Sequence, residues 1–223
     1  MKKSLSSLLI VLFLVNFTFA QKTKCSRISN FGSAEICLPK IKGYQECYTY
    51  PRVGQLADAT EVPANMVLGF YLNNGIYERK DSLGLISFDD YFKVYGTKQI
   101  KDYPADNALL KKMQEIMSGN FLTKNWDELS KEVDKIGLEI EIGVPTIIKS
   151  YNLNKNSFTY ITLTNYSMEG GNPVTLVMTM SGVLVNERLI WMAYYLNYNG
   201  EETIERAEKN SNFIVTNLLK SAN

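Results

Sequence analysis

The sequence predicts an α+β fold in which an antiparallel sheet is packed by helices. Four strand-like segments fill the last third of the chain, and short polar or glycine-rich connections join them: 146–151, 158–166, 174–185 and 188–198. Strands joined so closely pair with their neighbours in antiparallel fashion. Nearly every residue in 66–72 is apolar, which is typical of a strand buried on both faces. An apolar stripe at helical spacing over 204–218 indicates a closing helix that lies across the sheet.

The N-terminal segments are the least regular. Residues 21–30 are polar, and we expect them to fray before the ordered part begins near Phe31. A short strand is predicted over 34–38, where Pro39 ends it. Residues 43–63 show no sustained periodicity, so we expect an extended or mixed loop with room for one helical turn.

The middle of the chain contains one expected strand and two expected helices. Residues 88–95 are rich in aromatic and β-branched side chains, which favours a strand. Apolar residues three and four positions apart predict a helix over 105–118, with a proline near its start and a glycine just past its end. A second helix is predicted from Asn125, as N-cap, to Gly137. For the closing helix, Asn199 is the N-cap candidate.

Residues 1–20 have the pattern of a secretory signal peptide. Two lysines precede an apolar stretch, and Thr18 and Ala20 supply small side chains at the positions that signal peptidase requires. The alternative is a retained membrane anchor, but the apolar stretch is shorter than the roughly 20 residues that span a bilayer. We therefore expect cleavage between Ala20 and Gln21, which leaves a single α+β domain over 21–223. That chain is expected to be secreted or periplasmic, to come from a bacterium, and not to insert into a membrane.

Composition excludes several functions. The 24 basic and 23 acidic residues give a net charge of +1, so there is no basic footprint for nucleic acid. The chain contains no histidine, which removes Ser-His-Asp and Cys-His catalysis and histidine-ligated metals. Glycine-rich phosphate-binding loops and the G-x-S-x-G nucleophile motif are also absent from the sequence. We expect no cofactor and no metal.

Three cysteines follow the cleavage site: Cys25, Cys37 and Cys47. In an oxidising compartment, three cysteines form at most one internal bridge and leave one thiol. We predict a bridge between Cys37 and Cys47, because Pro39 and Gly43 allow the chain to turn back between them. A bridge between Cys25 and Cys37 is the alternative, and the remaining cysteine is expected to be a buried thiol.

Paired carboxylates are the candidates for acid-base chemistry. Glu139 and Glu141 are two residues apart in a strand-like segment, which places both side chains on one face about 7 Å apart. A solvated strand face explains the same alternation, and we favour that interpretation. Asp89, Asp90 and Glu78 lack the spacing of a calcium loop, so turn and cap roles suffice for them.

Aromatic residues are the candidates for a binding surface. The chain has 14 tyrosines and 10 phenylalanines, and several lie close together near the end of the last strand. Alternation places Tyr194 and Tyr198 on one face, with Tyr195 and Trp191 on the other. Aromatic rings suit both binding surfaces and strand cores, and we favour core packing here.

The order of these elements resembles the PsbP-like α/β/α sandwich superfamily, which includes the DcrB-like exported proteins. The resemblance rests on 66–72, on 158–198 with the run Arg188-Leu189-Ile190-Trp191 after a tight turn, and on the helix over 201–219. It implies an α/β/α sandwich and a binding or accessory role, and it carries over no catalytic residue.

These observations predict an exported, soluble, non-enzymatic binding or accessory protein of the cell envelope, immunity-like or chaperone-like, whose partner is another protein. The alternative is a secreted hydrolase that uses paired carboxylates. Two carboxylates roughly 5 to 9 Å apart in a deep pocket would favour the enzyme, and an aromatic patch over an undivided sheet would favour binding.

Overall fold

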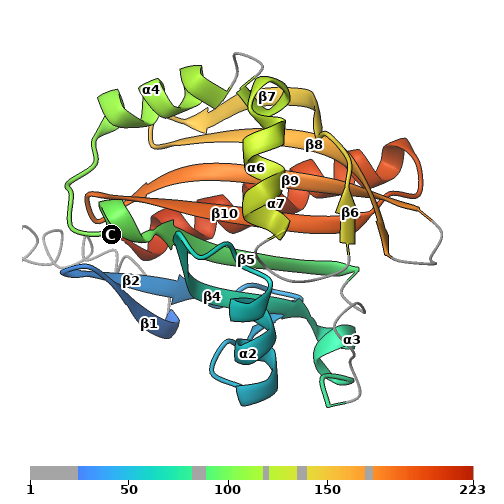
Figure 1. Ribbon diagram of the computed structural model, residues 1–223. Coiled ribbons are helices and arrows are strands. Elements are labelled where there is room, and N and C mark those ends of the chain that lie inside the picture. The colour runs from blue at the N-terminus through green and yellow to red at the C-terminus, as the bar shows by residue number, and fades with distance from the viewer. Residues whose placement is uncertain (1–24, 82–88, 118–120, 135–139, 169–172, 223) are drawn as a thin grey trace, which may run out of the picture.

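An eight-stranded antiparallel sheet forms the centre of the computed structural model (Figure 1). The structure describes residues 25–81, 89–117, 121–134, 140–168 and 173–222. The predicted signal peptide and its predicted cleavage site between Ala20 and Gln21 lie outside the described residues. The strand order is β3-β4-β5-β10-β9-β8-β6, and β7 pairs with the same strand, β8, as β6 does. The predicted α+β architecture of an antiparallel sheet packed by helices is confirmed.

The elements of the first half are β1 (Cys25–Phe31), β2 (Ala34–Pro39), β3 (Tyr44–Glu46), α2 (Pro51–Ala59), β4 (Asn65–Asn73), α3 (Asn74–Tyr77), β5 (Asp90–Thr97) and the 3-10 turn η1 (Lys98–Ile100). The second half contains α4 (Asn107–Ile116), α5 (Leu122–Lys124), α6 (Trp126–Asp134), β6 (Ile140–Ile142), β7 (Thr146–Asn154), β8 (Ser157–Met168), β9 (Val174–Val185), β10 (Arg188–Asn197) and α7 (Glu201–Ser221).

Helices cover both faces of the sheet. In Figure 1 the long helix α7 runs behind the strands, while α4 and α6 lie in front. Ile214, Val215 and Leu218 of α7 are at most 1% exposed and belong to one core cluster with β5, β9 and β10. Burial of such side chains stabilises the fold by roughly 1.5 to 3 kcal/mol each. On the opposite face, α4 packs against β8 and β10, and α2 packs against β4.

The C-terminal strands form where the sequence predicts them. β8, β9 and β10 pair in continuous antiparallel register, and β10 also pairs with β5. The turn between β9 and β10 has positive φ at both Asn186 and Glu187, as a two-residue type I′ hairpin requires. The predicted apolar strand over 66–72 is β4, which is buried along most of its length.

The predicted disulfide between Cys37 and Cys47 is wrong. The structure joins Cys25 to Cys37, with their Cα atoms 5.3 Å apart, and Cys47 is a buried free thiol. The chain reverses at Gly32, whose φ is +60°, so β1 folds back along β2 and brings Cys25 near Cys37. Cys47 instead follows β3, and its amide donates to the Phe70 carbonyl of β4.

The remaining differences concern the N-terminal half and one helix cap. The segment expected to fray contains β1, because pairing with β2 satisfies its backbone. The expected loop over 43–63 contains the nine-residue helix α2, which has Pro51 at its start and buries Val53 and Ala57. The N-cap of α7 is Gly200 rather than Asn199, and the Asn199 amide donates to the Thr203 hydroxyl.

Candidate functional site

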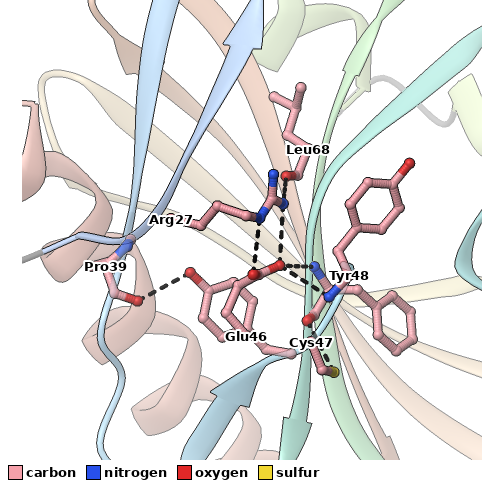
Figure 2. Close-up of polar contacts among 8 residues, drawn as sticks. Arg27, Pro39, Glu46, Cys47, Tyr48 and Leu68 are labelled. Atoms are coloured by element: carbon pink, nitrogen blue, oxygen red, sulfur yellow. Dashed lines mark hydrogen bonds and ion pairs between the residues drawn. The ribbon is translucent and has the colours of Figure 1, made fainter. Parts of the chain in front are cut away.

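A buried carboxylate, Glu46, fastens the β1–β2 hairpin to the sheet (Figure 2). Nε of Arg27 donates to one carboxylate oxygen at 2.9 Å, and Nη2 donates to the other at 3.2 Å. That second oxygen also accepts from the backbone amides of Tyr48 and Phe70 at 3.2 and 3.4 Å. We call this group the Glu46 junction: Arg27, Glu46, Tyr48, Leu68 and Phe70.

The Glu46 junction is closed to further partners. The Glu46 side chain is 4% exposed, and Arg27 makes a further hydrogen bond to the Leu68 carbonyl. The Arg27 guanidinium also lies 5.3 Å from the centre of the Tyr48 ring, within the range of a cation–π contact. Burial and a hydrogen bond to Asp58 raise the pKa of Tyr48 to about 12. These contacts describe a structural clamp.

A second buried ion pair joins Lys93 of β5 to Glu61. Nζ of Lys93 lies 2.5 Å from Oε2 of Glu61. Both side chains are at most 10% exposed. The other carboxylate oxygen accepts from the Asn65 amide at 2.9 Å. The Lys93 ammonium lies over the rings of Tyr95 and Tyr195, and burial raises the pKa of both tyrosines. This cluster ties α2 to the sheet and is likewise enclosed.

A third carboxylate, Asp90, is held by neutral donors at the end of the sheet where β5 begins. The hydroxyls of Tyr44 and Tyr194 donate to Oδ1 of Asp90 at 2.7 and 2.9 Å. The Asn73 amide donates to Oδ2 at 3.4 Å, and the Asn210 amide of α7 donates to the Tyr194 oxygen at 2.9 Å. Burial, reinforced by the neighbouring Asp90 carboxylate, raises the pKa of both tyrosines. The hydroxyl groups of Tyr44 and Tyr194 therefore keep their protons.

An open hollow of about 380 Å³ lies over this network, and we call it the Asp90 hollow. It is formed where β4 and β10 end and β5 begins, between α3 and the first turns of α7. Its polar lining contains two cations, two carboxylates and three amides: Asn73, Arg79, Asp89, Asp90, Asn197, Asn199 and Arg206. The buried side chain of Ile76 and the backbone of Gly75 complete the lining. The same hollow is thus lined by positively and negatively charged side chains.

Several lining side chains have a group without a partner among the described residues. Neither the Arg206 guanidinium nor the Asp89 carboxylate forms a hydrogen bond or ion pair with another described residue. Oδ1 of Asn197 is buried and accepts no hydrogen bond within the described part of the chain. Arg206 and Asp89 are exposed, so their charges can be reached by a ligand, whereas the buried Oδ1 of Asn197 cannot. The Asp90 hollow is therefore the candidate functional site.

The aromatic residues of β10 belong to the core, as predicted. Tyr194 is fully buried beside α7, and Tyr198 is half-buried against the same cluster. Trp191 and the half-buried Tyr195 pack on the other face. The facing derived from alternation is confirmed, and these residues do not form an exposed patch. Tyr194 instead supports the Asp90 hollow through its hydroxyl group.

The paired carboxylates considered for acid-base catalysis are not brought into the hollow. Glu139 lies outside the described residues. Glu141 is exposed on the short strand β6, and its Oε2 accepts from the Ser167 hydroxyl at 3.4 Å. Asp89 and Asp90, interpreted from the sequence as turn residues, line the hollow. Both oxygens of Asp90 already accept hydrogen bonds, which leaves that carboxylate poorly placed to take a proton from a substrate.

Sequence reasoning missed Arg79, Asn197 and Arg206. The signal that points to the hollow is a set of Asn and Asp residues at the ends of buried strands, at 73–74, 89–90, 197 and 199. That signal gains meaning only when β4, β5 and β10 are known to be neighbours.

Among the described residues there is no group of three or more Cys, Asp or Glu side chains placed to hold a metal ion. None of the helices that the structure describes is both long and apolar enough to cross a membrane.

Comparison with known proteins gives little further guidance. No model of a known protein family matches the sequence, and no curated protein matches it. Among solved structures, the Ran-binding protein Mog1p of Saccharomyces cerevisiae is 12% identical, with 84% of this chain and 86% of that chain covered and a TM-score of 0.33. A point mutant of the protein Mog1 is 11% identical, with 88% and 93% covered and the same TM-score of 0.33.

Proposed function

We propose that this chain is an exported, non-enzymatic binding or accessory protein of the bacterial cell envelope, and that its partner docks at the Asp90 hollow. Export is supported by the signal-peptide pattern of residues 1–20. The partner is another protein in this proposal. The helices on both faces of the antiparallel sheet support a relation to the PsbP-like sandwiches, which we propose as the finer description of the fold.

The proposal rests on a contrast within the hollow. The Asp90 carboxylate is held in place by hydrogen bonds, whereas other polar side chains of the lining have no described partner. Asp90 is fixed by two tyrosines and Asn73, so the floor does not need to rearrange when a partner arrives. Arg206, Asp89 and Asn197 keep hydrogen-bonding groups without described partners. The fixed Asp90 carboxylate is preorganised, and the exposed charges of Arg206 and Asp89 can pair with groups of the partner.

The test is capture from an envelope extract with the immobilised mature chain, residues 21–223, and with two variants. Arg206→Glu reverses the charge of one wall, whereas Lys209→Glu makes the same change on an exposed α7 position that does not line the hollow. We expect a partner that the mature chain and Lys209→Glu retain and Arg206→Glu loses. The retained protein is then purified and titrated calorimetrically against the three forms.

Two results would contradict the proposal. One is equal retention by both variants, which would remove the hollow from the interface. The other is a hydrolytic activity of the mature chain that disappears in the double variant Glu139→Gln, Glu141→Gln, which would establish the enzyme instead.

A further inference from the structure

The Asp90 hollow offers two side chains of opposite charge without described partners, and each requires a different feature of a ligand. Arg206 carries a positive charge and several N–H donors, so it suits a carboxylate. Asp89 carries a negative charge and accepts only, so it suits a cation. Both side chains are exposed, so a ligand can reach them, whereas Oδ1 of Asn197 is buried and closed to a ligand. A ligand that pairs with Arg206 and Asp89 presents an anion and a cation within a small volume.

The other charged lining groups do not change this requirement. Asp90 already accepts from three side chains, and Nε of Arg79 donates to the Gly75 carbonyl at 3.3 Å. A simple anion such as phosphate would meet the negative charge of Asp89 and Asp90, and a simple cation would meet Arg206. The balance of charge therefore selects a ligand that carries both signs.

The size of the hollow limits how much of a polypeptide it accepts. Its volume of about 380 Å³ is near the lower end of the range of roughly 300 to 1,000 Å³ that is typical of ligand pockets. It accommodates one or two residues and not a folded surface. A chain end suits this space because only its last one or two residues have to fit into it.

We propose that the Asp90 hollow binds the free C-terminal residue of a partner polypeptide, and that this residue is lysine or arginine. The α-carboxylate pairs with Arg206, and the cationic side chain pairs with Asp89. Capture of a free chain terminus is a known mode of peptide recognition. The inference rests on the proposed function, because it names the part of the protein partner that enters the hollow.

The experiment titrates the mature chain with four synthetic ligands. The reference is an N-acetylated tetrapeptide with a C-terminal lysine and a free carboxyl group. Its matched relatives are the C-terminal amide, which removes the anion, and the peptide with a terminal alanine, which removes the cation. We expect each relative to bind at least about tenfold more weakly, because each loses one charge-assisted contact. The fourth ligand, Nα-acetyllysine, has the same charges without the preceding chain, and we expect weaker binding than for the reference.

Matched variants of the protein assign each contact. In Arg206→Gln the acid and the amide should bind equally, and in Asp89→Asn the lysine and alanine peptides should bind equally. Lys209→Gln keeps both preferences, because this exposed residue does not line the hollow. A merely structural role of Arg206 or Asp89 would weaken all ligands by the same factor.

Three outcomes overturn the inference: equal affinity for acid and amide in the unmodified chain, no binding of the reference at about 1 mM, or equal binding of Nα-acetyllysine and the peptide. The last result would assign the hollow to a free amino acid. If the peptides do not bind as expected but the envelope extract yields a partner that Arg206→Glu loses, the inference fails and the proposed function stands. Discrimination among the peptides without a captured partner supports this inference and contradicts only the retention expected from the envelope extract.

Discussion

The Glu46 junction and the Asp90 hollow both hold a carboxylate beside tyrosine rings, but they use their polar groups differently. At the junction, Glu46 accepts from Arg27 and from two backbone amides, and its side chain is 4% exposed. At the hollow, Asp90 is held by neutral donors, and charged groups remain unpartnered around it. A site that satisfies its own groups stabilises the fold, whereas a site that leaves groups unsatisfied has capacity for a ligand.

The largest expected effect comes from breaking the junction. Glu46→Ala removes the partner of Arg27 and an acceptor of two backbone amides, which leaves a partly buried charge unpaired. We expect a loss of about 3 to 5 kcal/mol in the free energy of unfolding, measured by denaturant titration. The control is Glu208→Ala, which breaks a more exposed ion pair with Lys149 and should cost about 0 to 1 kcal/mol. Equal losses in both variants would show that the junction is not a clamp.

A somewhat smaller effect is expected from the disulfide that closes the same hairpin. Cys25→Ser opens a bridge between residues separated by 12 positions, and the chain-entropy model gives about 3 kcal/mol for a loop of this size. The measurement is the unfolding free energy of the variant against that of the oxidised parent. If the variant is as stable as the parent, the Glu46 junction and the buried hairpin side chains Phe31, Ile36 and Leu38 hold the hairpin without the bridge.

Counting thiols checks the pairing itself. The unreduced parent should show one thiol when denatured, and that thiol should be Cys47. Burial raises the pKa of Cys47 to about 12, so the native thiol should react slowly at pH 8. Labelling of Cys25 or Cys37 in the unreduced protein would contradict the bridge.

The dependence of stability on alkaline pH tests the two tyrosines that hold Asp90 beneath the hollow. Burial raises the pKa of Tyr44 and Tyr194, so the folded state keeps their protons above pH 10, where the unfolded chain loses them. Stability from these groups is fully present below about pH 10 and falls as pH rises further, by about 1.4 kcal/mol per pH unit for each group. In the variant Tyr44→Phe, Tyr194→Phe, the fall above pH 10 should be shallower, as measured by unfolding at a series of pH values. The same slope in parent and variant would show that these phenols are not held neutral by the fold.

Local signals predicted most of the sheet, and long-range pairing decided what they missed. The strands β8, β9 and β10 follow one another through short turns, so alternation over a few residues was sufficient. The disulfide depended on the reversal at Gly32, in a segment too polar to be expected as a strand. The hollow depended on contacts such as that between Asp90 and Tyr194, which are 104 positions apart. No local pattern contains that information.

The smallest expected effect on stability lies within a single helix. Arg206 and Asn210 are one turn apart on α7, but Asn210 donates to the Tyr194 oxygen at 2.9 Å, and Arg206 has no partner among the described residues. Asn210→Ala should therefore lower the free energy of unfolding by about 1 kcal/mol, because it removes a partly buried hydrogen bond. Arg206→Gln should change it by less than about 0.5 kcal/mol, as for an exposed side chain without such a contact. Calorimetric melting of both variants measures the difference. A loss of 1 kcal/mol or more in Arg206→Gln would mean that its guanidinium already serves the fold, and the hollow would then resemble the junction.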